Sequence, residues 1–384
     1  MNLFVFYPDT YVRRCNDTVL FIDLHNGEYL LEKDNTVNVS EYHPWFEITQ
    51  GSQYLADRCS IKKLGYVLKC STIPFIQQKR IHVVSSVHRT AELMKFSEGY
   101  YTKDLLRELH ILTHNTTYQA PSDVVYAQME YPTWGASGCI PICALTDLAN
   151  TSSILSVVIS GDIDCYLTSC LIPFVTSDKH VTIRTYGNRI NMDKAIALLT
   201  KYPQVRLEVL VDSIAMLPYI ESISRKDFLD RILVAFLIKD MNELDAFTQC
   251  SYETKTFIPV LYDVTAQQSV VNEMLLDIDD IVKSSMTSLD IYKKQMFHPN
   301  NYGLLLLDSK GNVFDWLSCI GNLCKTDIYT LLNRNLHTPK CSWYMTRRKW
   351  NSCKYCVFAD ICPALSIYEL QGIIPCVCKN RPVD

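Results

Sequence analysis

Several features that would assign the chain to a common protein class are missing from the sequence. No apolar run reaches the roughly eighteen residues that a membrane span needs, so we expect none. The 37 Lys and Arg and 41 Asp and Glu give a net charge of −4, which argues against a general role on nucleic acid or a membrane surface. A globular protein is therefore expected, and 384 residues suffice for two or three domains.

The motifs of common nucleotide-binding and hydrolytic sites are also missing. The chain contains no G-x-x-x-x-G-K-[ST], no G-x-G-x-x-G, no G-x-S-x-G and no H-E-x-x-H. Its 9 histidines are dispersed, which disfavours a histidine-based metal site or nucleophile. The first ten residues have no basic region, no long apolar core and no cleavage site of a secretory signal. We therefore expect a cytoplasmic protein whose thiols are reduced.

Cysteine is abundant, and it is concentrated near the end of the chain. Six of the 16 cysteines lie in one stretch of under forty residues: Cys341, Cys353, Cys356, Cys362, Cys376 and Cys378. The central three form a C-x2-C-x5-C run. Two thiolates separated by two residues can turn onto one metal ion or cluster edge, and two further thiolates complete four-fold sulfur coordination.

This spacing predicts a zinc or iron–sulfur site, and it does not separate the two metals. The alternative is that these cysteines are small buried hydrophobes or disulfides, and the expected reducing compartment disfavours disulfides. The other ten cysteines are expected to be mostly core residues: Cys15, Cys59, Cys70, Cys139, Cys143, Cys165, Cys170, Cys250, Cys319 and Cys324.

Residues 1–102 are predicted to form a β-rich N-terminal domain with helices. Apolar runs at Thr18–Leu24 and Glu28–Lys33 flank Asn26-Gly27, the strongest short hairpin signature. Further strands are expected at Gly65–Lys69 and Arg80–Ser85, and a helical pattern begins after them. Such a domain is a candidate peptide-binding module through a free sheet edge, or else a plain structural cap.

Residues 103–265 alternate between strand and helix patterns, which predicts a parallel sheet with right-handed crossovers, doubly wound or barrel-like. The strand-like runs are Val124–Tyr131, Ile154–Ser160, Val181–Thr185, Val205–Val211, Ile232–Ile238 and Phe257–Leu261. Residues 266–300 are expected to form a helical linker, and residues 301–384 a metal-binding domain that begins with a hairpin.

Polar residues follow several of the predicted strands. Active sites of parallel α/β folds lie at the carboxyl ends of the strands, where Asp162, Asp212 and Asp263 are found. Three carboxylates at one edge can bind a ligand or perform acid–base chemistry. The alternative is that these positions are turns, which favour Gly, Asn, Asp and Ser for backbone reasons.

The order of parts in the last third of the chain resembles the SPASM domain, the auxiliary-cluster module of radical SAM peptide maturases. Leu305–Val313, Gly321-Asn322-Leu323, a short helix and C-x2-C-x5-C follow one another as in that module. The ending Cys353–Glu369, with Cys362-Pro363 and Tyr368-Glu369, is similar to the pseudo-rSAM/SPASM proteins of GG-Bacteroidales type peptide natural-product systems. The region upstream, from about residue 105, looks like the partial barrel that precedes SPASM.

The resemblance implies an α/β fold: a degenerate radical SAM-like partial (β/α) barrel between the N-terminal β-rich domain and a C-terminal Cys-rich, SPASM-like domain. Radical SAM enzymes hold their catalytic cluster on C-x3-C-x2-C. Here the only C-x3-C is Cys139 and Cys143, and Thr146 stands where the third thiolate belongs. The S-G-G-E-P stretch is reduced to Ser160-Gly161-Asp162-Ile163. Cleavage of S-adenosylmethionine is therefore not expected.

The SPASM-like module departs from its family as well. Ser366 stands where a cysteine of the first auxiliary cluster belongs, and Trp316 stands near another. The resemblance thus implies one retained [4Fe–4S] cluster, with zinc as the alternative. Its implied ligands are Cys353, Cys356, Cys362 and either Cys376 or Cys378, with Cys341 as a spare candidate. The nearby cations Arg347, Arg348, Lys349 and Lys354 either offset the charge of the cluster or form a solvated surface.

Three functions follow as hypotheses. The first is a non-catalytic radical SAM homologue that binds a precursor or leader peptide, or an active radical SAM maturase, in the maturation of a ribosomal peptide natural product (RiPP). The second is a peptide-modifying enzyme that uses the retained cluster or the three Asp carboxylates. The third is a zinc-stapled adaptor without redox chemistry.

Overall fold

The structure is a computed structural model of the 384-residue chain. It describes residues 1–33, 39–41, 43–72, 105–113, 140, 142–211, 213–216, 218, 229–238, 240–250, 255–259, 272, 275–284, 286–370, 374 and 376–379. The strands predicted at Arg80–Ser85 and Val124–Tyr131 lie outside these residues, as do Cys139, Asp212 and Asp263. Among the described helices, none has both the length and the apolar character required to cross a membrane.

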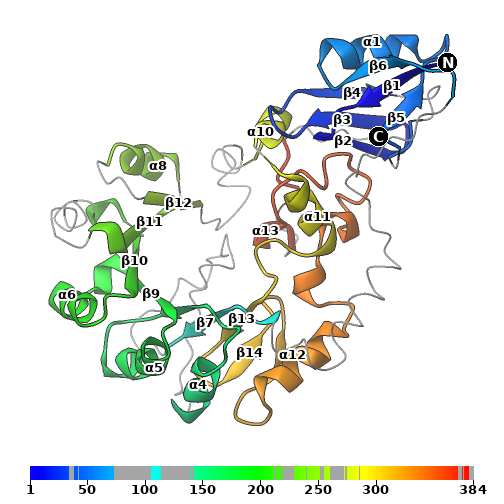
Figure 1. The fold of residues 1–384 in the computed structure, drawn as a ribbon. Coiled ribbons are helices and arrows are strands. Elements are labelled where there is room, and N and C mark those ends of the chain that lie inside the picture. The colour runs from blue at the N-terminus through cyan, green and yellow to red at the C-terminus, as the bar shows by residue number, and fades with distance from the viewer. Residues whose placement is uncertain are drawn as a thin grey trace.

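The N-terminal part contains two three-stranded antiparallel sheets (Figure 1). One sheet has the order β5 (Trp45–Glu47), β1 (Asn2–Phe6), β6 (Gly65–Lys69), and the other has the order β2 (Thr10–Cys15), β3 (Thr18–Asp23), β4 (Tyr29–Lys33). Helix α1 (Gln53–Ile61) packs on the first sheet through Leu55, Ala56 and Cys59. The hairpin predicted around Asn26-Gly27 is confirmed as β3–β4.

A nine-stranded sheet forms the body of the molecule. Seven parallel strands come first, in the order β12 (Lys255–Pro259), β11 (Ile232–Ile238), β10 (Val205–Val211), β9 (His180–Tyr186), β8 (Ser156–Ser160), β7 (Glu108–Leu112) and β13 (Leu304–Leu307). The antiparallel strands β14 (Asn312–Phe314) and β15 (Cys319–Asn322) complete it. The predicted strand–helix alternation with a parallel sheet is therefore confirmed.

Helices α4 (Ile142–Ala149), α5 (Cys165–Thr176), α6 (Met192–Lys201) and α8 (Met241–Thr248) lie on the outer side of the curved sheet (Figure 1). Asp164, Asn191 and Asp240 cap three of them by accepting backbone N–H bonds in the first turn. Alternate strand residues such as Leu109, Ile111, Val157 and Ile159 pack with the helices in one large core. This alternation leaves the opposite face of the sheet to Glu108 and His110.

The end of the chain is not a separate layer, because β13 pairs in parallel with β7. Its Leu304 lies opposite Glu108. The predicted hairpin after Gly303 is confirmed as β13–β14, but it continues the large sheet rather than standing alone. The division into residues 103–265, 266–300 and 301–384 remains a prediction.

Two short helices connect the sheet to the cysteine-rich segment. Both α10 (Ile278–Lys283) and α11 (Ser288–Met296) begin with a capping box, at Asp277/Asp280 and Thr287/Asp290. Beyond β15 lie α12 (Ile328–Leu336) and α13 (Ile367–Leu370). The 3₁₀ turns of the described chain are η1 (Gly187–Arg189), η2 (Ile214–Met216), η3 (Leu229–Arg231), η4 (Ser342–Tyr344) and η5 (Arg347–Lys349).

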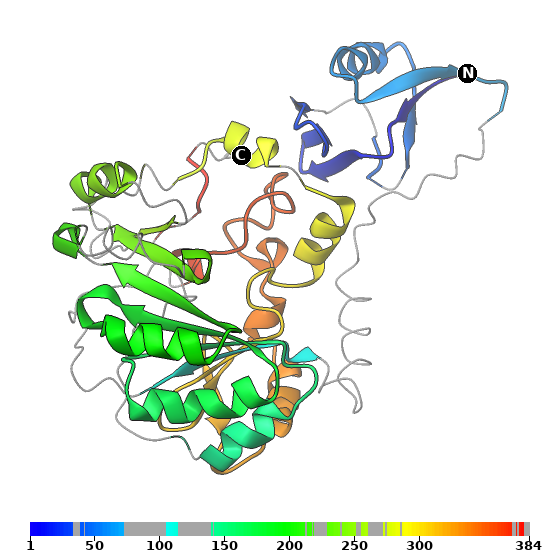
Figure 2. The ribbon, with the colours of Figure 1, turned by 60° about the vertical axis from the view of Figure 1, so that its left-hand side comes forward.

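The second N-terminal sheet packs directly against the cysteine-rich segment. Tyr11, Leu20 and Ile22 of β2 and β3 form one buried cluster with Phe358 and Cys362. Ile281 and Ile291 of the two connecting helices complete this cluster. The view of Figure 2 shows the N-terminal strands beside these helices, with the cysteine-rich segment next to them. Segments more than three hundred residues apart in sequence therefore share one core.

The prediction that the ten cysteines outside the tail are mostly buried is wrong. Of those that the structure describes, only Cys59, Cys170 and Cys250 are buried. Four are exposed: Cys143, Cys165, Cys319 and Cys324. Cys143 and Cys165 lie in the first turns of α4 and α5 on the outer surface, whereas Cys319 begins β15 and Cys324 follows two residues after its end. An apolar local sequence thus does not decide which side of a helix a cysteine occupies.

Candidate metal centre

The cysteine-rich segment is built from tight turns rather than from long helices or strands. Cys353 donates its backbone N–H to the carbonyl of Trp350 at 2.9 Å, and Cys356 donates to the carbonyl of Cys353 at 2.9 Å. Cys362 donates to the carbonyl of Phe358 at 2.9 Å. Successive turns of this kind bring side chains that are three to nine positions apart back toward one point. The chain then returns through α13 to Cys376 and Cys378.

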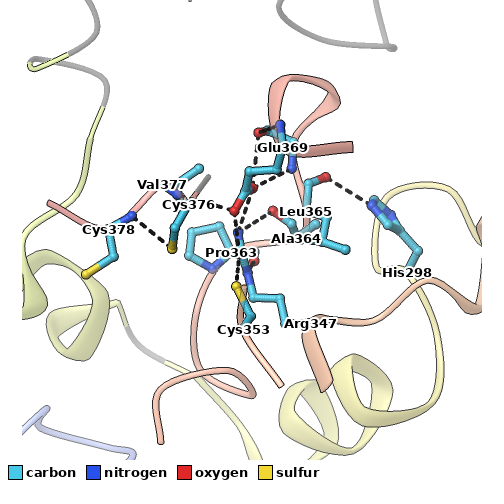
Figure 3. A network of polar contacts seen from close by, with 11 residues as sticks. His298, Arg347, Cys353, Pro363, Ala364, Leu365, Glu369, Cys376, Val377 and Cys378 are labelled. Carbon is cyan, nitrogen blue, oxygen red and sulfur yellow. Dashed lines mark hydrogen bonds and ion pairs between the residues drawn. The ribbon is translucent and has the colours of Figure 1, made fainter. Parts of the chain in front are cut away.

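Cys353 and Cys376 form the centre of this arrangement. Their sulfur atoms and a carboxylate oxygen of Glu369 all lie within 4.8 Å of one another. The two cysteines and the glutamate are buried. The backbone N–H of Cys378 points at the sulfur of Cys376, with N and Sγ 3.4 Å apart (Figure 3). The thiol of Cys353 is hydrogen-bonded to Cys376, and this bond lowers the pKa of Cys376 while it raises the pKa of Cys353.

Cys356, Cys362 and Cys378 lie beside this pair. The fully buried Cys362 belongs to the same apolar cluster that Cys356 and Cys378 contact from its edge. Burial raises the pKa of Cys362 to about 12; Arg347 opposes this shift, and the neighbouring Cys356, Cys376 and Cys378 contribute to it. The structure thus brings together all five cysteines that the sequence analysis assigned to the site.

Cys341 lies elsewhere. Its sulfur accepts a hydrogen bond from Asn335 Nδ2 at 3.3 Å, inside the large core under the nine-stranded sheet. Burial, together with the carboxylate of Asp315, raises the pKa of its thiol to about 12. Asp315 is itself held by Asn335 and by the backbone N–H of Ser342. Cys341 is therefore a structural thiol of the core and not part of the five-cysteine cluster.

Arg347 connects the parts of this site. Its guanidinium donates to both carboxylate oxygens of Glu369, at 2.7 and 3.0 Å, and to the sulfur of Cys353 at 3.3 Å (Figure 3). It also donates to the carbonyls of Pro363 and Ala364, at 2.6 and 3.1 Å. Burial alone would lower the pKa of Arg347, but Glu369 offsets this effect and the pKa lies above its usual range.

Glu369 is a saturated acceptor and not a free metal ligand. Besides the two hydrogen bonds from Arg347, it accepts hydrogen bonds from the backbone N–H and the hydroxyl of Ser366, at 2.9 and 3.1 Å. It also accepts one from the backbone N–H of Val377 at 3.2 Å. A carboxylate offers about four lone-pair sites, and these donors occupy them. Glu369 therefore ties the Cys353 segment to the Cys376–Cys378 segment and leaves metal binding to sulfur.

The donor set fits a thiolate-bound metal. Cys356, Cys362 and Cys378 lie in apolar surroundings near the buried Cys353–Cys376 pair, and N–H groups from Arg347 and Cys378 point at the sulfurs of this pair. Thiolates in such a setting suit zinc or an iron–sulfur cluster and do not suit the hard cations calcium and magnesium. The bound group would hold four thiolates together and supply folding free energy or electron storage.

The other predicted site residues are distributed differently. Arg347 contacts the sulfur cluster and Arg348 binds Asp360, whereas Lys349 lies over the Tyr344 ring and Lys354 over the Tyr355 ring. Lys349 and Lys354 are exposed, which fits the solvated-surface alternative, whereas compensation of a cluster charge by Arg347 stays a prediction. Asp162 is half-buried in the turn after β8, and the other two Asp candidates lie outside the described residues.

Sequence analysis missed a charged cluster on the face of the sheet opposite the described helices α4, α5, α6 and α8. Glu108 and His110 on β7 are joined by a 2.8 Å hydrogen bond, and Arg184 on β9 pairs with Glu208 on β10 at 2.6 Å. Burial lowers the pKa of His110. Within the described part of the chain, no hydrogen-bond partner faces its Nδ1. The alternation Glu-Leu-His-Ile-Leu on a strand was the available indication, because it puts Glu108 and His110 on one face.

Comparison with models of protein families and with curated proteins gives no match. Among solved structures, SuiB of Streptococcus suis bound to the precursor peptide SuiA is similar to this chain, with 12% sequence identity and a TM-score of 0.47. The alignment covers 98% of this chain and 100% of that chain. A likeness below a TM-score of 0.5 does not establish a shared fold, so function has to follow from the residues of the site.

Proposed function

We propose that the chain is a non-catalytic, radical SAM-like protein that binds a precursor peptide or an active maturase in RiPP maturation, and that its tail holds one [4Fe–4S] cluster. The observation that carries the proposal is the contact between Cys353 and Cys376, with Cys362 near Cys376 and with Cys356 and Cys378 near Cys362. Four of these five thiolates are the ligands, and Cys353, Cys356 and Cys362 are three of them.

The assignment as non-catalytic depends on the missing thiolate. Reductive cleavage of S-adenosylmethionine needs three cysteines on one loop, and Thr146 on α4 occupies the third position here. Cys143, the nearest cysteine, is exposed on the outer side of the sheet. The turn after β8 also carries Asp162 where the family resemblance requires a second glycine. The chain thus has the parallel sheet but lacks the residues that cleavage of S-adenosylmethionine requires.

The cluster would have a structural role. The segment from η4 onward contains few long elements, so its shape depends on side-chain contacts and on the bound metal. A closed four-thiolate site contributes folding free energy directly, on the order of 10 kcal/mol for comparable zinc sites. Removing one ligand should then unfold this segment rather than abolish a reaction.

Anaerobic purification followed by iron, sulfide and zinc analysis tests the metal assignment. About four irons and four sulfides per chain, with broad absorbance near 400 nm, are expected for one cysteine-ligated cluster. Cys353→Ser should lose this metal, and the matched variant Cys59→Ser, at a buried cysteine of the N-terminal core, should retain it. One zinc without iron would make the chain a zinc-stapled adaptor. Unchanged metal in Cys353→Ser would refute the ligand assignment.

The binding role is tested by fluorescence anisotropy with labelled precursor peptides carrying their leader segments. We expect saturable binding and, by mass spectrometry, a bound peptide of unchanged mass after incubation with S-adenosylmethionine and a reductant. A peptide modified by this chain alone would refute the non-catalytic assignment.

The Glu108–His110 pair favours a second candidate, a peptide-modifying enzyme that uses acid–base chemistry. A buried, neutral histidine oriented by a carboxylate has the arrangement of a general base. His110→Gln and Asp162→Asn separate the candidates. An enzyme that uses either residue should lose turnover and keep peptide affinity, whereas a binding protein should show no change in product.

A further inference from the structure

Arg347 uses every hydrogen-bond donor that it has. Arginine offers five N–H groups in a fixed fork. In this chain Nε donates to Pro363, Nη1 donates to Glu369 and to Cys353 Sγ, and Nη2 donates to Glu369 and Ala364. The side chain is 4% exposed. Since the other four donors fix the plane of the guanidinium, the fifth N–H is held on the sulfur of Cys353.

We propose that Arg347 is a positioning residue of the metal centre that donates a charge-assisted N–H···S hydrogen bond to the Cys353 thiolate and thereby raises the reduction potential of the bound cluster. This inference rests on the proposed function, in which Cys353 is a ligand. A [4Fe–4S] cluster with four thiolates gains one negative charge when it accepts an electron from an external reductant. A cationic donor on a ligand sulfur stabilises the reduced form more than the oxidised form.

The neighbouring Arg348 provides the contrast. It lies one residue further along the same 3₁₀ turn, but it binds the carboxylate of Asp360 through Nε and Nη2. Among the described contacts, none joins Arg348 to a sulfur atom. The two arginines are adjacent in sequence and carry the same charge, and they differ in the group that they contact. An effect of general positive charge should appear at both, and an effect of the N–H···S bond only at Arg347.

The experiment compares Arg347→Lys, Arg347→Gln and Arg348→Lys in the full chain, loaded anaerobically. The midpoint potential is measured by dithionite titration with redox mediators. We expect a more negative midpoint potential in both Arg347 variants, because even lysine cannot donate the same set of planar hydrogen bonds as the guanidinium. Arg348→Lys should keep the wild-type potential. Equal potentials in wild type and Arg347→Gln, or an equal shift in Arg348→Lys, would overturn the proposal.

A second measurement covers variants that lose the cluster during purification. The same proteins are reconstituted with Co²⁺ alone, and the thiolate-to-cobalt charge-transfer band is recorded. Without the N–H donor, the sulfur lone pair rises in energy, so the band should move to longer wavelength in the Arg347 variants only. An unmoved band would again overturn the inference. A wild-type chain that binds neither iron nor cobalt would instead refute the metal centre itself, which separates the two failures.

Discussion

Tyr11 donates its phenolic hydrogen to the carboxylate of Asp360, 349 residues further along the chain. Asp360 also pairs with Arg13 at 2.7 Å, accepts from Arg348 Nε at 2.6 Å and accepts from Gln295 at 3.1 Å. The carboxylate is 1% exposed. Because Asp360 lies between Cys356 and Cys362, this one carboxylate links the N-terminal sheet to the cysteine-rich segment, in addition to the apolar cluster that the two share.

Replacing Asp360 with Asn should destabilise the protein strongly. Burial alone would raise the pKa of Asp360, but the hydrogen bond from Arg348 and the charge of Arg13 hold it at about 2, so the group is ionised near neutral pH. Asp360→Asn leaves the buried Arg13 and the half-buried Arg348 without their counter-charge, which costs about 3–5 kcal/mol. Denaturant unfolding of the metal-loaded protein measures the loss.

The matched control is Glu28→Gln, which removes the exposed ion pair between Glu28 and Lys62 in the same N-terminal domain. Solvent screens this pair, so no measurable change in stability is expected. If Asp360→Asn were as stable as Glu28→Gln, the network would not hold the two parts of the chain together.

Local sequence patterns predicted most of the described helices and strands. The runs at β8 and β11 are continuous and apolar, whereas polar residues interrupt β9 and β10, and the caps Asp164 and Asn191 mark two of the helices between the strands. The pairing of β13 with β7 was not predictable in this way. It joins segments nearly two hundred residues apart, and no local pattern of Leu304–Leu307 specifies that partner.

Gly27→Ala should destabilise the docking of the N-terminal hairpin. Gly27 has a φ of +73°, and a Cβ there would lie 2.7 Å from the carbonyl oxygen of Val282 in α10. The left-handed conformation alone costs an L-residue about 1–2 kcal/mol, and the backbone of α10 would also have to move. Thermal unfolding measures the change, with Gly51→Ala as the control.

Gly51 has a similar position in a surface turn, but its nearest neighbour would be 3.9 Å from the added Cβ and its φ is not positive. We therefore expect little change in the melting temperature of Gly51→Ala. Equal melting temperatures for the two variants would mean that the hairpin does not pack against α10.

Stability should fall between about pH 6.5 and pH 4 because of His298. Its Nδ1 accepts from the backbone N–H of Asn301 at 3.2 Å, and its Nε2 lies 3.1 Å from the carbonyl of Leu365 (Figure 3). Burial lowers the pKa of His298 to about 4. Below about pH 6.5 the unfolded chain binds a proton that the folded chain does not, so the free energy of unfolding decreases by up to about 1.4 kcal/mol per pH unit.

The test compares unfolding free energies at pH 7 and pH 5 for wild type, His298→Gln and His180→Gln. His180 is exposed at the start of β9 and serves as the control. The difference between pH 7 and pH 5 should shrink in His298→Gln and stay the same in His180→Gln. Other groups titrate in all three proteins alike, so an unchanged difference in His298→Gln would exclude His298 as the source.

Of the candidate site, only the cysteines were predictable from the sequence. A C-x2-C-x5-C run is a local pattern, and Cys353, Cys356 and Cys362 could be assigned from it. The roles of Arg347 and Glu369 could not, since nothing in the sequence distinguishes Arg347 from Arg348 next to it. Their different partners arise from the 3₁₀ turn, which directs one guanidinium toward Cys353 and the other toward Asp360.

Metal removal should loosen the N-terminal sheet as well as the tail. Phe358, Ile361 and Cys362 form the surface on which Leu20 and Ile22 of β3 pack, and this surface lies on turns that the metal is proposed to hold in shape. We therefore expect a chelator under reducing conditions to raise amide hydrogen exchange in β2 and β3, because the residues that pack on these strands become mobile. Strands β9 and β10 lie in the separate large core and should keep their protection. Unchanged exchange in β3 after complete loss of metal would show that the turns keep their shape through the Asp360 network alone.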